Sequence, residues 1–191
     1  MVGELSKEKK EEIIERVEDK ARAYEWEYHG CGQSVLLALQ EELHLVDPSS
    51  FGAAFKAAGF VAAGTARMGN MCGALNGGIM ALGLLAGRER IEDPVYPNLE
   101  DIDEASGQPK SLELARKFYH RFIQEFGSWI CRDIHISLFG RSFDLSIPAD
   151  HEKFRHAGGY IKCSKLVGKA ARIAGEIILE KLESDEAKQK S

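Results

Sequence analysis

Apolar residues recur at helical spacing over most of the 191-residue chain, and no run of alternating apolar and polar residues predicts a strand. The clearest apolar stripe predicts a first helix over residues 6–28, which His29 and Gly30 end. The stripe consists of Ile13, Ile14, Val17, Ala21 and Tyr24. This segment reads as an amphipathic helix with one buried face.

The same periodicity predicts further helices, separated by turns that contain glycine or proline. They cover residues 34–45, 51–58, 72–86, 111–126, 129–138 and 160–182. The segment 59–78 is rich in glycine and predicts a tightly folded loop that leads into the helix at 72–86. We therefore expect an all-α protein, a compact bundle of about five to seven helices with Gly-rich loops.

The length of the chain fits one domain, and we expect residues 1–191 to form a single helical domain. Two stretches interrupt the helical pattern and are predicted to be exposed insertions. One is 88–110, which contains three of the five prolines, and the other is 139–159. The polar tail, 183–191, is predicted to fray.

The charge pattern argues against two classes of function. The formal net charge is -5, and basic residues are interleaved with acidic ones, so no basic field exists to hold nucleic acid or an anionic membrane. The longest apolar stretch, 79–86, is too short to cross a bilayer, and the chain starts without the apolar segment of a secretory signal. We therefore expect a cytoplasmic protein without nucleic-acid binding or membrane insertion.

Four cysteines stand out as candidates for chemistry: Cys31, Cys72, Cys131 and Cys163, at separations of 41, 59 and 32 residues. No two of them form a CxxC pair. The chain therefore lacks the paired ligands of a zinc knuckle, the dithiol of a thioredoxin-like protein and the attachment motif of a c-type haem. In a reducing compartment, such cysteines are more typical of metal binding or catalysis than of a disulfide framework.

Each cysteine lies at or near a predicted helix start, after a turn that contains glycine. Free N–H groups and the helix dipole stabilise a thiolate there, and an iron–sulfur cluster gains from N–H donors to its sulfur ligands. A cluster would require the four sulfurs to lie within roughly 7 Å of one another. We expect them to meet in one pocket whose wall is formed by the glycines of 69–78. The simplest alternative is that they are buried, space-filling residues.

The segment Cys72-Gly73-Ala74-Leu75-Asn76-Gly77 resembles the central motif of a family of redox-active proteins, the C_GCAxxG_C_C family, although it reads Cys-Gly-Ala where the family has Gly-Cys-Ala. The resemblance covers about residues 28–171, and further segments carry it. They are 31–36, 77–84, 126–131 and 163–167. The resemblance implies a redox role for the four cysteines. It does not imply haem c, because the attachment motif is missing.

We interpret the chain as an electron-transfer or redox-sensing protein in which Cys31, Cys72, Cys131 and Cys163 bind an iron–sulfur cluster. Two alternatives stay open. In the first, the chain is a thiol–disulfide oxidoreductase, with Cys72 as the attacking thiol. In the second, it is a non-redox metal-binding or interaction module, an alternative that zinc bound by all four thiolates would favour. The redox partner, a homodimer and enzymatic activity are all left open by the sequence.

Other residues are weaker candidates. His135 follows Cys131 by four residues, so on a helix it shares a face with that thiol as a candidate ligand or proton donor. The remaining candidates are His29, His156, Arg67 and Arg132, of which the arginines would offset the charge of a cluster.

Gly73, Gly77 and Ala81 recur at i, i+4 and i+8 and form a smooth ridge along the predicted helix at 72–86. Such a ridge suits close packing of two helices. It also suits the approach of a bulky cofactor to the backbone, and the sequence supports both readings.

Overall fold

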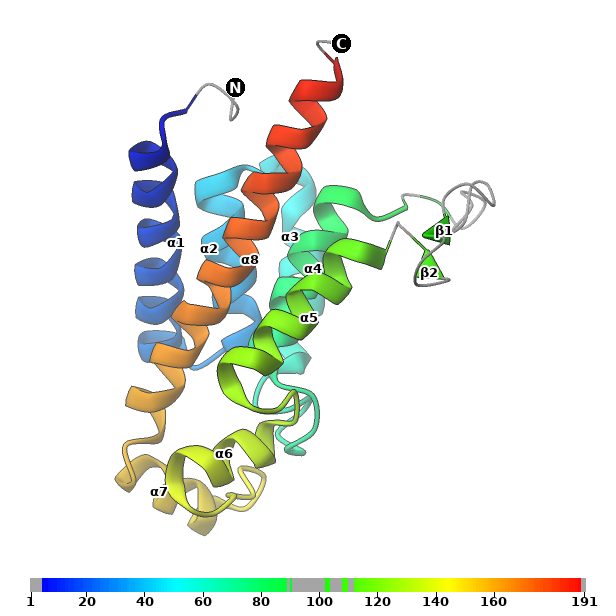
Figure 1. Cartoon of the computed structure of the whole chain (residues 1–191). Coiled ribbons are helices and arrows are strands. Elements are labelled where there is room, and N and C mark those ends of the chain that lie inside the picture. The colour runs from blue at the N-terminus through cyan, green and yellow to red at the C-terminus, as the bar shows by residue number, and fades with distance from the viewer. Residues whose placement is uncertain (1–4, 89, 91–101, 104–107, 110–111, 190–191) are drawn as a thin grey trace.

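The computed structural model describes residues 5–88, 90, 102–103, 108–109 and 112–189, and within them eight α-helices and one short 3₁₀ helix, η2 (Figure 1). The helices are α1 (Lys7–Tyr28), α2 (Cys31–Leu43), α3 (Pro48–Ala57), η2 (Ala58–Val61), α4 (Gly73–Ala86), α5 (Glu113–Phe126), α6 (Cys131–Phe139), α7 (Pro148–His156) and α8 (Gly159–Gln189). Two strands of two residues, β1 (Ile102–Asp103) and β2 (Gln108–Pro109), pair antiparallel. The predicted all-α fold is confirmed.

Five long helices form the body of the molecule, with α8 packed against α1, α2, α4 and α5 (Figure 1). The short helices α6 and α7 close the lower end of this bundle, where α1 ends and where α2 and α8 begin. Both chain termini lie at the opposite end. Of the helices in the described residues, none is both long enough and apolar enough to cross a membrane.

The predicted first helix is confirmed, and its ends show why it forms. The Ser6 side chain accepts a hydrogen bond from the Lys9 N–H at 3.3 Å and so caps the first turn. At the other end, His29 adopts a left-handed conformation, and its N–H donates to the Glu25 carbonyl at 3.1 Å. Val17 and Ala21 are fully buried on the predicted stripe.

Two segments are more helical than the sequence indicated. The stretch 139–159, predicted as an exposed insertion, contains α7, and Phe154 from this helix is buried against Phe143 and Leu145. Pro148 starts α7 at a position where a helix tolerates proline, so the residue that suggested a loop begins a helix instead. The tail 183–191 was expected to fray, but α8 continues to Gln189. Most of the other predicted insertion, 88–110, lies outside the described residues.

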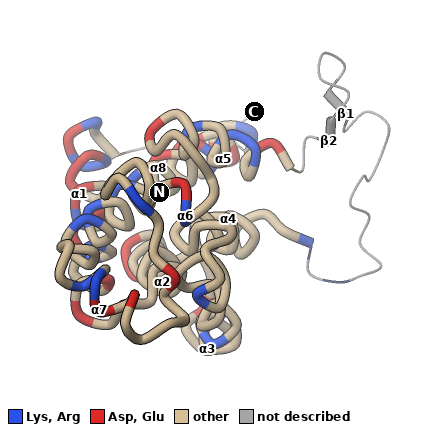
Figure 2. The backbone as a smooth tube through the Cα atoms, turned by 90° about the horizontal axis from the view of Figure 1, so that it is seen from below, with Lys and Arg blue, Asp and Glu red and all other residues tan. Residues whose placement is uncertain are grey.

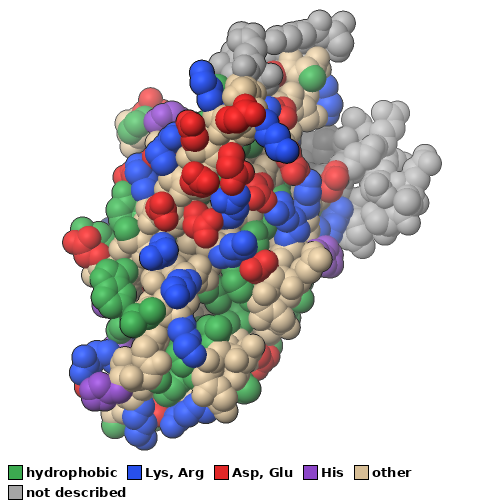
Figure 3. Space-filling view, turned by 60° about the vertical axis from the view of Figure 1, so that its left-hand side comes forward, with side chains coloured by type: hydrophobic (Ala, Val, Ile, Leu, Met, Phe, Trp, Pro, Cys, Tyr) green, Lys and Arg blue, Asp and Glu red, His purple; other side chains and the backbone are tan. Residues whose placement is uncertain are grey.

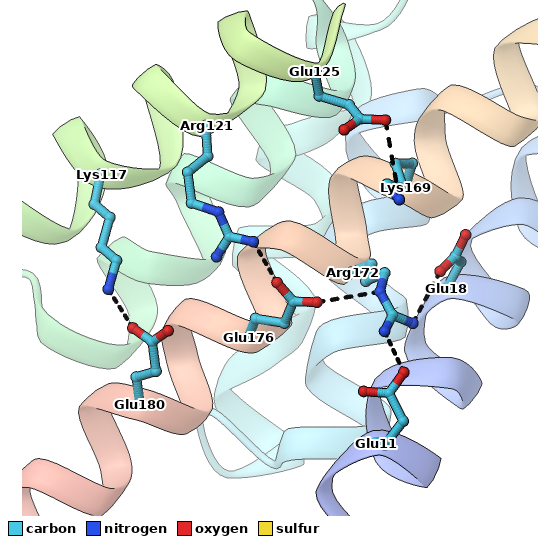
Figure 4. Close-up of polar contacts among 9 residues, drawn as sticks. All are labelled: Glu11, Glu18, Lys117, Arg121, Glu125, Lys169, Arg172, Glu176 and Glu180. Atoms are coloured by element: carbon cyan, nitrogen blue, oxygen red, sulfur yellow. Dashed lines mark hydrogen bonds and ion pairs between the residues drawn. The ribbon is translucent and has the colours of Figure 1, made fainter.

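Ion pairs connect α5, α8 and α1 across the surface of the bundle (Figure 4). Arg172 of α8 is the centre: it pairs with Glu176 at 3.2 Å, with Glu18 at 3.3 Å and with Glu11. Glu176 in turn pairs with Arg121 of α5. Ion pairs at a partly exposed surface contribute little one by one, and they gain when several charges form a network as these do.

Charges of both signs are mixed on the parts of the molecule that Figures 2 and 3 show. Lys and Arg alternate with Asp and Glu along α1 and α7 (Figure 2), and acidic and basic side chains interleave on the face that α1 and α8 share (Figure 3). These faces therefore carry no large field of a single sign.

The glycine ridge of α4 serves close packing against α2. A Cβ atom added to Gly77 would lie 2.3 Å from the Gly32 carbonyl oxygen of α2, which no real contact allows. A Cβ on Gly73 would lie 2.3 Å from Cys31 Sγ and 2.8 Å from the Val61 carbonyl oxygen. Of the two readings of the ridge, helix packing is therefore the one that the contacts support.

This packing predicts opposite effects for two glycine substitutions in the same helix. Gly77→Ala should lower the free energy of unfolding by about 1–3 kcal/mol, because backbone atoms of α2 would have to move. Gly83→Ala, whose Cβ would meet nothing within 4 Å, should raise it by about 0.5–1 kcal/mol through its helix propensity. Urea unfolding followed by circular dichroism measures both. Equal effects of the two substitutions would contradict the close approach.

Candidate functional site

All four cysteines line one cavity of about 410 Å³. The four thiols come from four helices: Cys31 begins α2, Cys72 is the N-cap of α4, Cys131 begins α6 and Cys163 lies in the second turn of α8. All four are free thiols. The fold therefore gathers around one cavity four cysteines whose successive separations in the chain are 41, 59 and 32 residues.

Cys72 and Cys131 are held by two backbone segments that run side by side. Met71 and Ile130 form an antiparallel bridge. The Cys72 N–H donates to the Trp129 carbonyl at 2.9 Å, and the Cys131 N–H donates to the Asn70 carbonyl at 2.7 Å. These hydrogen bonds fix the start of α6 against the start of α4.

Cys31 lies beside the same helix start. Its Sγ accepts a hydrogen bond from the Ala63 N–H at 3.4 Å. Because a Cβ on Gly73 would meet this sulfur at 2.3 Å, the sulfur rests against the residue that directly follows Cys72. The glycine of the motif is thus required where it stands, since any side chain there would displace Cys31.

A left-handed turn forms another part of the cavity wall. Ala63, Thr65, Ala66 and Arg67 all have φ between 51° and 66°, and Gly64 between them has φ 75°. Residues other than glycine rarely adopt this conformation, and each costs roughly 1–2 kcal/mol. The turn presents the Ala63 N–H to Cys31, which gives the strained backbone a role in the site.

The wall predicted from the glycines of 69–78 is wrong. The lining from this part of the chain comes instead from Gly59, Phe60, Ala62, Ala63, Ala66 and Arg67. The glycines of α4 pack against other parts of the bundle instead. Gly77 contacts the α2 backbone, and Gly78 contacts the Phe118 ring.

The thiols share a cavity without forming a preassembled metal site. Within the part of the chain that the structure describes, no three Cys, His, Asp or Glu side chains are grouped closely enough to hold a metal ion. The close approach of all four sulfurs that a cluster requires is therefore not present in this arrangement. Metal or cofactor binding by Cys31, Cys72, Cys131 and Cys163 stays a prediction.

Burial raises the pKa of every one of the four thiols. It raises the pKa of Cys72 and of Cys131 to about 12 and that of Cys31 and Cys163 well above the ordinary value. For Cys72, hydrogen bonds from the backbone of Ala74 and Leu75 act in the opposite direction but are outweighed by desolvation. The expectation of stabilised thiolates at helix starts is thus wrong, because loss of water has a larger effect on the thiol pKa than the backbone N–H groups near the sulfurs.

Glu25 is a cavity residue that the sequence analysis missed. It lies in the last turn of α1 and is only 5% exposed, and its Oε2 has no hydrogen-bond partner among the described residues. Burial raises the pKa of its carboxyl to about 8, while a hydrogen bond with Ser34 acts the other way. The signal was available, since Glu25 follows Ala21 by four residues and so continues the apolar stripe of α1.

His135 lines the same cavity, 3.7 Å from Cys131 Sγ through its Nε2 atom. The predicted sharing of a helix face with Cys131 is therefore confirmed, and a ligand role stays a prediction. The ring stacks on Phe154 with centroids 5.1 Å apart, and within the described part of the chain its Nδ1 has no hydrogen-bond partner. Burial lowers the pKa of the imidazole to about 4, so it is neutral near pH 7.

The other candidates separate into two groups. His29 and Arg67 line the cavity, and Arg67 donates to the Leu145 carbonyl at 3.5 Å. His156 and Arg132 do not line it, and His156 instead faces Glu152 at 3.2 Å. Two exposed aromatic residues, Tyr28 and Phe60, also belong to the lining, so the cavity has an apolar mouth.

Comparison with known proteins gives one match. A family model described as "Putative redox-active protein (C_GCAxxG_C_C)" matches residues 29–177, a stretch that contains all four cysteines. Neither a curated protein nor a solved structure matches the chain.

The raised thiol pKa values predict slow alkylation. Near neutral pH, the four native thiols should react with iodoacetamide at least about tenfold more slowly than in urea, because the thiolate is the reactive form and burial suppresses it. Mass spectrometry of peptides at timed intervals resolves each cysteine. A Cys72 that reacts faster in the native chain than in urea would contradict this and would favour an attacking thiol.

The Glu25 carboxyl predicts a pH dependence of stability. Its pKa is about 8 in the folded chain against an ordinary 4.5, so between these values the folded state keeps a proton that the unfolded state releases. The free energy of unfolding should therefore fall as pH rises, by up to about 1.4 kcal/mol per pH unit, relative to Glu25→Gln. Urea unfolding of the metal-free proteins from about pH 5 to about pH 8 measures this. Parallel curves for the two proteins would contradict it.

Proposed function

The chain belongs to the C_GCAxxG_C_C family of redox-active proteins, and on that premise we propose that it is an electron-transfer or redox-sensing protein whose four cysteines hold an iron–sulfur cluster. One observation carries the proposal. The chain contains four cysteines in total, and every one of them lines the same cavity although they come from four different helices. Space-filling cysteines have no reason to share one cavity.

The residues of the cavity fit such a group by type and by surroundings. Thiolates are the ligands of iron–sulfur clusters, and N–H groups near the sulfurs tune the potential. Cys31 already accepts an N–H from Ala63, and Cys72 lies beside the N–H groups of Ala74 and Leu75. Ligation requires the neutral thiols to release their protons and the sulfurs to move closer together, since no ligand group is preassembled in the described residues.

When bound, the cluster would supply one-electron chemistry, and the protein would set its potential. The chain's own part is to exclude water through the buried positions of Cys72 and Cys131 and to present N–H donors to sulfur. We place the protein in the cytoplasm, where a reducing environment keeps free cysteines available for ligation. A separate redox partner would deliver or accept the electron.

The two alternatives are less well supported. An attacking thiol at Cys72 requires a lowered pKa, and burial raises the pKa of Cys72 to about 12. A zinc site would use the same four sulfurs and is therefore distinguished by its metal and its lack of colour.

The proposal predicts a brown protein with iron and acid-labile sulfide after anaerobic purification. Cys163→Ser should lose most of the bound iron, because one ligand is missing. Ser164→Ala is the matched control. Ser164 directly follows Cys163 in the chain and is buried, but it does not line the cavity. Metal analysis and the visible absorption spectrum measure the outcome. A colourless, metal-free preparation would contradict the cluster, and a colourless protein with bound zinc would favour the non-redox module.

A further inference from the structure

A groove of about 790 Å³ between α1, α5, α6 and α8 shares a wall with the thiol cavity. Two buried residues, Ile134 of α6 and Leu166 of α8, line both spaces. Each follows a cysteine of the site, Cys131 or Cys163, by three residues and so lies on the same side of its helix. One layer of side chains therefore separates this groove from the thiols.

The groove is lined by more basic than acidic side chains, and we call it the basic groove. Its cations are Arg22 of α1 and Lys162, Lys165 and Lys169 of α8. Two carboxylates line it as well, those of Glu18 and Glu125, and each already has a cation as its partner. The distances are 3.3 Å to Arg172 and 4.0 Å to Lys169 (Figure 4). The other three cations have no acidic partner among the described residues, so a local positive charge is left on a chain whose formal net charge is -5.

Apolar residues form the rest of the groove. Besides the two residues of the shared wall, Phe126 and Leu138 line it. An adjoining groove shares two of its cations, Arg22 and Lys165, and contains the exposed side chain of Trp26. In the lower half of the face in Figure 3, hydrophobic side chains lie beside basic ones. Exposed aromatic and apolar side chains next to arginine and lysine are typical of a surface that binds another protein.

We propose that the basic groove is the docking surface for the redox partner, and that the partner binds through an acidic surface with apolar residues at its centre. The inference rests on the proposed function, which requires such a partner, and extends it to the place and the chemistry of docking. Opposite charges steer two proteins together, and the apolar floor supplies contact area from which water is excluded. A nucleic acid would match the cations but would leave the apolar floor uncovered.

The shared wall gives the docking surface its purpose. A partner seated in the basic groove would be separated from Cys131 and Cys163 by the side chains of Ile134 and Leu166. One electron would pass across this wall between the thiol site and a one-electron carrier in the partner, so that one protein is oxidised as the other is reduced. No bond would need to form between the two proteins.

The first measurement uses a fluorescent peptide helix with glutamate on one face and leucine on the other as the probe for an acidic partner surface. Arg22→Glu/Lys165→Glu reverses two cations of the groove, and Arg22→Gln/Lys165→Gln removes the same two charges without adding carboxylates. The matched control is Lys7→Glu/Lys9→Glu, which changes the net charge as much as the reversal does. Lys7 and Lys9 are exposed in the first turn of α1 and line neither groove.

We expect the control to bind the peptide like the wild type and the reversed variant to bind it at least about tenfold more weakly, with the glutamine variant between them. Added salt should weaken the binding. Fluorescence anisotropy measures each affinity, and thermal unfolding checks that the variants are folded. Equal affinity of the wild type and the glutamine variant, or no binding at all, would overturn the inference. A peptide with serine in place of leucine that binds equally well would show an anion site only and would also overturn it.

The second measurement connects the groove to the thiols. The brown protein, reduced with dithionite, is oxidised in stopped flow by an anionic one-electron oxidant, hexacyanoferrate(III), or by a cationic one, hexaammineruthenium(III). Reversal of the groove cations should slow the first reaction at least about fivefold relative to the control and should not slow the second, because local charge steers the oxidant. Equal rates would place the electron path elsewhere, which would overturn the inference and leave the proposed function standing. A colourless, metal-free protein would overturn the proposed function itself, and the peptide would still decide whether the groove docks an acidic surface.

Discussion

The close contact between α2 and α4 determines the site. Because Gly77 has no side chain, the α4 backbone rests directly on the Gly32 carbonyl of α2, and this contact sets the two helix starts side by side. Cys31 and Cys72 are the residues at those starts. The bridge between Met71 and Ile130 then adds the start of α6 to the same place. The site is therefore a consequence of backbone packing, and its thiols need not be neighbours in sequence.

Burial decides the chemical state of these thiols. A helix start favours a thiolate by its N–H groups, yet the loss of water at Cys72 and Cys131 is larger and keeps both neutral. A neutral thiol is a poor nucleophile. It can still become a metal ligand, because an entering cation can replace its proton. Burial also favours the protonated form of the Glu25 carboxyl, because it raises the pKa of this group to about 8. Cys72 and Cys131 are thus poorly suited to attack on a disulfide.

Periodicity was enough to predict the long helices, because α1 and α8 bury a regular apolar stripe. It was not enough for α7, where Pro148 resembles a break, or for the left-handed turn at Ala63, Thr65, Ala66 and Arg67. Those four residues have no preference for a positive φ, and the turn is held by hydrogen bonds such as those from the Thr65 N–H to the Val61 carbonyl and from the Ala63 N–H to Cys31 Sγ. The four cysteines could be recognised as a set from the sequence. The place of Glu25 beside them could not, because only the position of α1 in the fold brings its carboxyl into the same cavity.

The end of the bundle that holds the cavity has a core of its own. Phe143, Leu145 and Phe154 form a small apolar cluster separate from the main one, and Cys163 packs against it. Two members of this cluster, Phe154 and Leu145, also line the thiol cavity. The cavity walls therefore connect the cluster to the long helices. A metal group held by thiols from α2, α4, α6 and α8 would cross-link this end to the bundle, so that its binding free energy would also stabilise the packing of α6 and α7. The absence of a CxxC pair would then have a physical meaning, since ligands brought from four helices would make metal binding and tertiary structure depend on each other.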